Sequence, residues 1–136
     1  MTWSCPACAR EFAKQRSHMC APAMSEAQYF AGRPDYQREV YVTVREHLES
    51  LGPVIVEFVN VGVFFKTKRN VVELRAMKNW VNVGFGLRRR ITHPRITRTT
   101  SMQGSGTWHG TRATSAADID DVVREWLTES YLASGV

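Results

Sequence analysis

Apolar residues first recur at helical spacing just after Arg33-Pro34-Asp35. Proline fits the first turn of a helix, and an acidic side chain is favourable near the positive end of its dipole. The apolar stripe that follows is formed by Val40, Val44, His47, Leu48 and Leu51. Gly52-Pro53 then stops the pattern. These signals predict one long helix, in which His47 is typical of packing at a helix edge rather than of a ligand.

A second helical pattern occupies the end of the chain. Ser115 is in the position of a capping serine, and Asp118 follows three residues later. The apolar positions of this predicted helix are Ile119, Val122, Val123, Trp126, Leu127 and Tyr131.

Between the two helices the pattern changes to short runs of β-branched and aromatic residues. These runs predict strands over residues 54–61, 63–69, 71–77, 80–87, 95–101 and 107–113. The clearest alternation lies in the fourth run, where Val81, Val83, Phe85 and Leu87 alternate with Trp80, Asn82, Gly84 and Gly86. Since successive side chains of a strand point to opposite faces, this strand has one apolar face and one face of small or polar residues.

The N-terminal segment contains the three cysteines of the chain and one histidine in the pattern Cys5-x2-Cys8-x9-His18-x-Cys20. Four such ligands match the Cys3His set of a structural zinc site, so a zinc ion and a small knuckle are expected here. The alternatives are free thiols, a catalytic zinc or a redox pair. A catalytic zinc ion keeps one coordination position open, whereas four ligands are present here. A redox Cys-x-x-Cys pair normally lies at the start of a helix in a βαβ context, and no strand pattern precedes Cys5. Arg10, Lys14 and Arg16 lie between the ligand pairs, where fingers contact phosphates.

Runs of strands flanked by helices indicate an α+β architecture. We expect an antiparallel sheet of about five or six strands, flanked by an N-terminal and a C-terminal helix and preceded by the knuckle. The expected organisation is a zinc knuckle over residues 1–22, a linker over 23–32 and an α+β domain over 33–136. Tyr29 and Phe30 of the linker are candidates for docking on that domain.

Composition agrees with one domain of 136 residues, of which 43% are hydrophobic. No apolar run approaches the length of a membrane span, and the N-terminus lacks the apolar stretch of a secretory signal. A cytoplasmic location with reduced thiols is therefore expected, and the odd number of cysteines fits a disulfide framework poorly.

The net charge of +5 is unevenly distributed. Between Glu73 and Asp118 there is no acidic residue, whereas the segment from Asp118 onwards is acidic. A basic middle indicates a polyanion partner such as nucleic acid. The alternative is a solvated face, neutralised in part by the acidic C-terminal helix.

Several basic and aromatic residues of the predicted strands and turns are candidates for polyanion binding. Tryptophans stack on bases and nearby cations bind phosphates, although each tryptophan is also a candidate core residue. The candidate residues are Lys66, Lys68, Arg75, Lys78, Arg88, Arg90, Arg95, Trp108, His109 and Arg112.

No motif indicates an enzyme. The sequence contains no G-x-G-x-x-G, no Walker sequence and no G-x-S-x-G. Glu57 and Glu73 are expected as surface residues of strands. The leading hypothesis is a zinc-containing module that binds a polyanion. A protein-interaction or self-associating adaptor, meeting an acidic partner or a second copy, is the alternative. An enzyme acting on a small phosphorylated or acidic substrate through Lys66, Lys68, Arg88 and His109 has the least support.

Five motifs together resemble one family. They are "WSCPACAREFAKQRSHMC", "YFAGRP", "LGPVIVE", "MKNWVNVGFGLRRRITHPRI" and "SAADIDDVVREWLTESY". Over residues from Trp3 to Tyr131 the chain is similar to the bacterial family of domains of unknown function numbered 5655. That family has no established activity. The resemblance implies an N-terminal zinc knuckle and, through related domains joined to restriction-like modules, a setting in nucleic-acid metabolism or phage defence.

Overall fold

The computed structural model describes residues 2–6, 9–15, 23–102 and 106–133 of the chain. Two small strands, β1 (Trp3–Ser4) and β2 (Glu11–Phe12), come first and pair with each other. The helices are α1 (Glu26–Phe30), α2 (Asp35–Leu51) and α3 (Asp121–Ala133), with a 3-10 turn at Ala116–Asp118. The larger sheet consists of β3 (Ile55–Val59), β4 (Gly62–Lys66), β5 (Asn70–Ala76), β6 (Val81–Leu87), β7 (Arg98–Ser101) and β8 (Thr107–Ala113).

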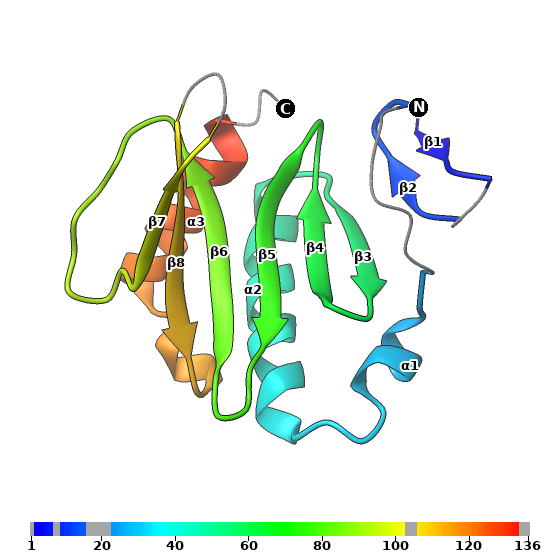
Figure 1. The fold of residues 1–136 in the computed structure, drawn as a ribbon, viewed down its shortest axis with the longest axis horizontal. Coiled ribbons are helices and arrows are strands. Elements are labelled where there is room, and N and C mark those ends of the chain that lie inside the picture. Colours follow the sequence, from blue (N-terminus) through cyan, green and yellow to red (C-terminus); the bar gives the residue numbers. More distant parts are fainter. Residues whose placement is uncertain (1, 7–8, 16–22, 103–105, 134–136) are drawn as a thin grey trace.

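The six strands form one antiparallel sheet in the order β3-β4-β5-β6-β8-β7 (Figure 1). Neighbours in the sequence are neighbours in the sheet, except that β8 inserts between β6 and β7. The predicted α+β fold, with one long helix before and one after an antiparallel sheet in the sequence, is therefore confirmed, and the sheet has six strands.

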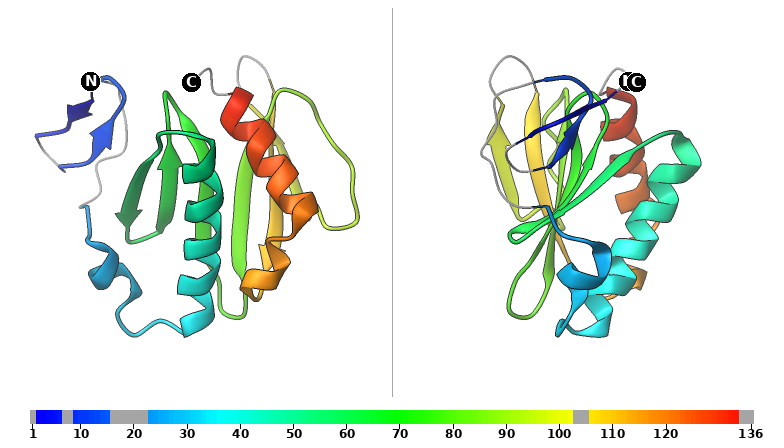
Figure 2. Two further views of the ribbon diagram at one scale, coloured as in Figure 1. Left: turned by 180° about the vertical axis from the view of Figure 1, so that it is seen from behind. Right: turned by 90° about the vertical axis from the view of Figure 1, so that its right-hand side faces the viewer.

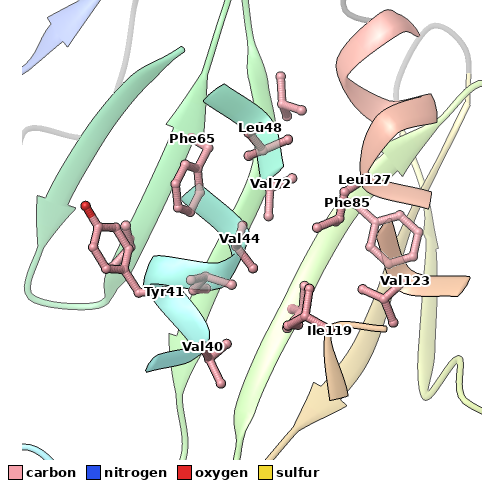
Figure 3. Close-up of a cluster of buried hydrophobic side chains, with 14 of the residues drawn as sticks. Val40, Tyr41, Val44, Leu48, Phe65, Val72, Phe85, Ile119, Val123 and Leu127 are labelled. Carbon is pink, nitrogen blue, oxygen red and sulfur yellow. The ribbon is translucent and has the colours of Figure 1, made fainter. Parts of the chain in front are cut away.

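Both long helices cover the same face of this sheet (Figure 2). Their apolar stripes pack on the inward residues of β4, β5 and β6, and Figure 3 shows this core. From the helices come residues such as Val44, Leu48 and Leu127, and from the sheet Phe65 and Phe85, all fully buried. The opposite face carries no helix among the described residues.

Period-two alternation decides which side chains reach that open face. Across the sheet the register aligns Glu57, Phe64, Glu73, Gly84, Gly110 and Arg98 in one row. The next row on the same face lies two residues further along, toward the start of β6, and contains Arg75, Asn82 and Arg112. Their immediate neighbours along the strands, such as Leu74 and Val83, point to the helices and are buried.

The N-terminal segment packs on the open side of β3 and β4. The Glu57 carboxylate lies 2.6 Å from the Arg10 guanidinium and 2.8 Å from the Lys66 ammonium, and all three side chains are almost completely buried. Lys66 also donates to the backbone carbonyl of Glu11 and lies 3.7 Å from the ring centroid of Phe12. The expectation of an exposed Glu57 is therefore wrong, because this carboxylate joins the N-terminal segment to the sheet.

Two local predictions differ from the structure. The segment expected as a linker contains α1, whose first turn is closed by a capping box between Ser25 and Gln28, and its Tyr29 is buried. The C-terminal helix is not capped by Ser115. Asp120 accepts a hydrogen bond from the Val123 N–H and precedes α3, because the chain first makes a 3-10 turn.

No helix among the described residues has both the length and the apolar character needed to cross a bilayer.

Replacing Glu57 by Gln is expected to lower the free energy of unfolding by about 3 kcal/mol or more, because it removes a buried carboxylate that is paired with two buried cations. Urea unfolding of the variant measures this loss. Glu46→Gln is the control, since Glu46 is exposed on α2. Equal stabilities of the two variants would contradict the role assigned to Glu57.

Candidate functional site

A hollow of about 660 Å³ lies on the open face, over β5, β6, β8 and β7. Its size is that of an ordinary small-molecule site. The floor includes Gly84 and Gly110, which are paired across β6 and β8 and have no side chains. The polar and aromatic residues around this floor are Glu73, Arg75, Trp80, Asn82, Thr97, Arg98, Thr100, Trp108 and Arg112.

The indole of Trp108 lies against the glycines of β6. A Cβ atom at Gly84 would be 2.7 Å from its Nε1, and one at Gly86 would be 3.2 Å from its Cε3. Such distances leave no room for any larger residue at Gly84 while the indole stays in place. Because Trp108 is only half-buried and borders the hollow, part of the ring remains available to a ligand.

The second tryptophan is held by a cation and an amide. The Arg112 guanidinium lies 4.2 Å from the ring centroid of Trp80, within the range of a cation–π interaction. The Trp80 indole N–H donates to Asn82 Oδ1 over 2.8 Å. An indole N–H is a donor only, so this bond fixes the amide of Asn82 with its NH2 group directed away from Trp80.

Charge in the hollow is predominantly positive. Arg75, Arg98 and Arg112 are all exposed, whereas Glu73 is the one carboxylate among the described lining residues. Arg75 and Glu73 are 3.5 Å apart, and Arg75 also lies 5.7 Å from the ring centroid of Phe64. Phe64 thereby separates the hollow from the buried Glu57 cluster, since the Arg10 guanidinium lies near its ring as well.

Of the predicted polyanion-binding residues, the structure brings Arg75, Trp108 and Arg112 together in this hollow. Lys78 is exposed in the turn between β5 and β6, and its neighbours in the sequence, Met77 and Trp80, line the hollow. Lys68 is exposed in the turn after β4, outside the lining.

Four further candidates lie elsewhere. Lys66 is 2% exposed and paired with Glu57. Arg95 binds the Asp120 carboxylate at 2.6 Å and the Asp118 carbonyl, and Arg88 donates to the Ala133 carbonyl. Arg90 borders a separate, smaller hollow beside β7. The acidic C-terminal segment thus pairs with part of the basic block, through Arg95 with Asp120 and Arg89 with Glu129.

His109 belongs to the helix-facing side, although it follows Trp108 directly. It is completely buried, and its ring stacks on Phe85 at 5.5 Å between centroids. The Ile91 N–H donates to its Nε2, so the neutral ring carries its proton on Nδ1. Burial lowers the pKa of His109 below the ordinary 6.5, and the charges of Arg89 and Arg90 act in the same direction. The structure therefore gives His109 a role in packing.

Arg98 was not among the candidates from the sequence, and it forms one wall of the hollow. It lies opposite Gly110 because β7 pairs with β8, and the short glycine-containing loop between the two predicted strands was the available signal for this pairing. Glu73 and Asn82 were also missed as site residues. The alternation of small and polar residues in 80–87 was the available signal for Asn82.

The expected metal ligands can be followed only in part. Cys5 is buried at the start of a turn in which its carbonyl accepts from the Ala9 N–H at 2.7 Å and its N–H donates to the Arg10 carbonyl at 2.8 Å. Cys8, His18 and Cys20 lie outside the described residues. Within the described ranges, no three His, Cys, Asp or Glu side chains gather as a metal site.

A family model described as Domain of unknown function (DUF5655) matches residues 26–134. The chain belongs to this family. Comparison with curated proteins and with solved structures returns no match. The DUF5655 region begins at α1 and includes the entire six-stranded sheet and both long helices. All residues that line the hollow therefore lie inside the DUF5655 region, while the β1–β2 hairpin precedes it.

Changing Gly84 to Ala is expected to displace the Trp108 indole and to lower the free energy of unfolding by about 1–3 kcal/mol through overpacking. Urea unfolding and tryptophan fluorescence measure both effects. Gly110→Ala is a matched control, because a Cβ atom there has its nearest neighbour at 3.6 Å, an ordinary contact. The packing of Trp108 on β6 is refuted if both variants behave alike.

Proposed function

We propose that this domain is a binding module for single-stranded nucleic acid and that the hollow on its open face is the binding site. The single observation that supports this most strongly is the presence of two tryptophans and three exposed arginines in one hollow. The same residue types on a sheet surface serve RNA-binding and single-strand-binding folds, where bases stack on aromatic rings and cations track the backbone.

The electrostatic part of the proposal rests on which cations remain available. Arg89 and Arg95 form salt bridges with Glu129 and Asp120 of the C-terminal segment, whereas Arg98 and Arg112 are exposed at the hollow. Arg112 already lies over an aromatic ring and can meet a phosphate at its outer edge. Phosphate contacts of this kind release counterions, so binding must weaken steeply with salt.

The preference for a single strand follows from the aromatic surface. A duplex hides the faces of its bases, so only an unpaired base can stack on Trp108. The indole is supported from below by Gly84 and Gly86, which reduces the ordering that binding would otherwise require. A hollow of about 660 Å³ has room for a base and its sugar.

The N-terminal segment is proposed to carry a structural zinc ion bound by Cys5, Cys8, His18 and Cys20. Support comes from their spacing and from the turn closed by the hydrogen bond that the Ala9 N–H donates to the Cys5 carbonyl, with Ala9 at a φ of 61°. Such a turn suits a Cys-x2-Cys pair that presents two thiolates to one ion. The ion would order the segment that buries Arg10 against Glu57, and it has no proposed part in chemistry.

Substituting Arg98 by Ala is expected to weaken binding of a fluorescent single-stranded oligomer and to reduce its log–log salt slope by about 1, because one phosphate contact is lost. Trp108→Leu should cost about 1–3 kcal/mol of binding free energy through lost stacking. Fluorescence anisotropy at several salt concentrations measures both.

The control for Arg98→Ala is Arg124→Ala, since Arg124 is also exposed and belongs to α3, which covers the opposite face of the sheet. Circular dichroism checks that each variant folds. Equal losses for Arg98→Ala and Arg124→Ala would show that binding follows net charge rather than this hollow. Absence of binding to any oligomer at low salt would refute the proposed function.

Removing zinc with a chelator is expected to loosen the N-terminal segment while the six-stranded domain stays folded, because the core of that domain lies within residues 29–131. Metal analysis should find one zinc per chain, and limited proteolysis should then cut only before residue 26. A Cys5→Ser variant should behave as the chelated protein does. Global unfolding on chelation, or a chain purified without zinc, would contradict this division.

A further inference from the structure

The hollow contains a carboxylate that a site for phosphates alone does not need. Glu73 lies on β5 in the row of Gly84 and Gly110, and its side chain is 17% exposed. Its Oε1 accepts from the Asn70 amide at 3.0 Å, and its Oε2 lies 3.5 Å from the Arg75 guanidinium, at the limit of a hydrogen bond. Each carboxylate oxygen has two acceptor positions, so the group has capacity for further donors.

A donor with a fixed orientation lies next to it. Asn82 is opposite Arg75 on β6, and Glu73 is opposite Gly84, so Asn82 and Glu73 are diagonal neighbours on adjacent strands. Diagonal positions on one face are within reach of long side chains. Since Trp80 occupies the Asn82 carbonyl oxygen, the amide offers its NH2 group as a donor.

These groups surround one aromatic surface. Trp108 lies over Gly84, the residue that pairs with Glu73 and follows Asn82 on the same face. A base stacked on this indole therefore has a two-oxygen acceptor and an NH2 donor beside one of its edges. Of the four standard bases, only guanine has two adjacent donors, N1–H and the 2-amino group, next to an acceptor, O6, on its Watson–Crick edge.

We propose that the hollow reads an unpaired guanine base. Trp108 supplies the stacking surface, Glu73 accepts hydrogen bonds from N1–H and the 2-amino group, and Asn82 donates to O6. This inference rests on the proposed function, since the Watson–Crick edge of a base is accessible only in a single strand. The proposal assigns Glu73 to base selection and the three arginines to the nucleic-acid backbone. This division explains why the described lining residues include one carboxylate beside three guanidinium groups.

Fluorescence anisotropy with oligothymidine of about ten nucleotides carrying one central substitution tests the proposal. Guanosine at that position should bind about tenfold more tightly than adenosine, as expected for a bidentate contact such as the one proposed for Glu73. Inosine should fall between them, because it keeps N1–H and O6 but lacks the 2-amino group.

Glu73→Gln should abolish the preference for guanosine over adenosine while binding of the adenosine oligomer stays equal or tightens, since an acid has been removed from a site for phosphates. The control is Glu125→Gln, an exposed acid on α3, which should keep the preference. A wild-type protein that binds all oligomers alike, or a Glu73→Gln variant that still prefers guanosine, overturns the assignment and leaves the proposed function intact. If no oligomer binds at low salt, the proposed function itself fails.

Discussion

The open face depends on the absence of side chains at two glycines of β6. Every second residue of this strand is apolar and buried against the helices, while Asn82, Gly84 and Gly86 face the other way. Without Cβ atoms at the two glycines, the Trp108 indole can lie against the strand rather than stand up from it. The space of the hollow depends on this contact, because any larger residue at Gly84 would push the ring into the space beside it.

A second constraint divides the open face into a closed and an accessible half. Over β3 and β4 the N-terminal segment is held by the buried carboxylate of Glu57 between Arg10 and Lys66. Over β5 to β7 nothing among the described residues covers the sheet. Phe64 lies at the boundary between the two halves. The Arg10 guanidinium of the closed half and the Arg75 guanidinium of the accessible half both lie near its ring. A buried carboxylate with two cations is expensive to separate, so the N-terminal segment behaves as part of the sheet's surface.

The sequence predicted the elements well because each has a strong local period. The stripe through Val40, Val44 and Leu48 and the alternation through Val81, Val83 and Phe85 leave little choice of element type. The site was harder, because it depends on which strands are neighbours. Trp108 and His109 were grouped as candidates, yet residues adjacent on a strand must face opposite sides, and the period of two alone could have separated them. The burial of Lys66 required knowledge of the N-terminal segment, and the position of Arg98 required the pairing of β7 with β8.

The place of β7 in the sheet has a consequence for how the protein responds to a ligand. β7 is four residues long, stands at the end of the strand order and is paired only with β8 among the described strands. One wall of the hollow is thus its least anchored part, and amide hydrogens there can exchange through local opening that costs less than global unfolding. A ligand that spans Arg98 and the centre of the sheet would join the edge to the core and slow that exchange. Binding of a ligand in the hollow would then make the β7 edge of the sheet more rigid.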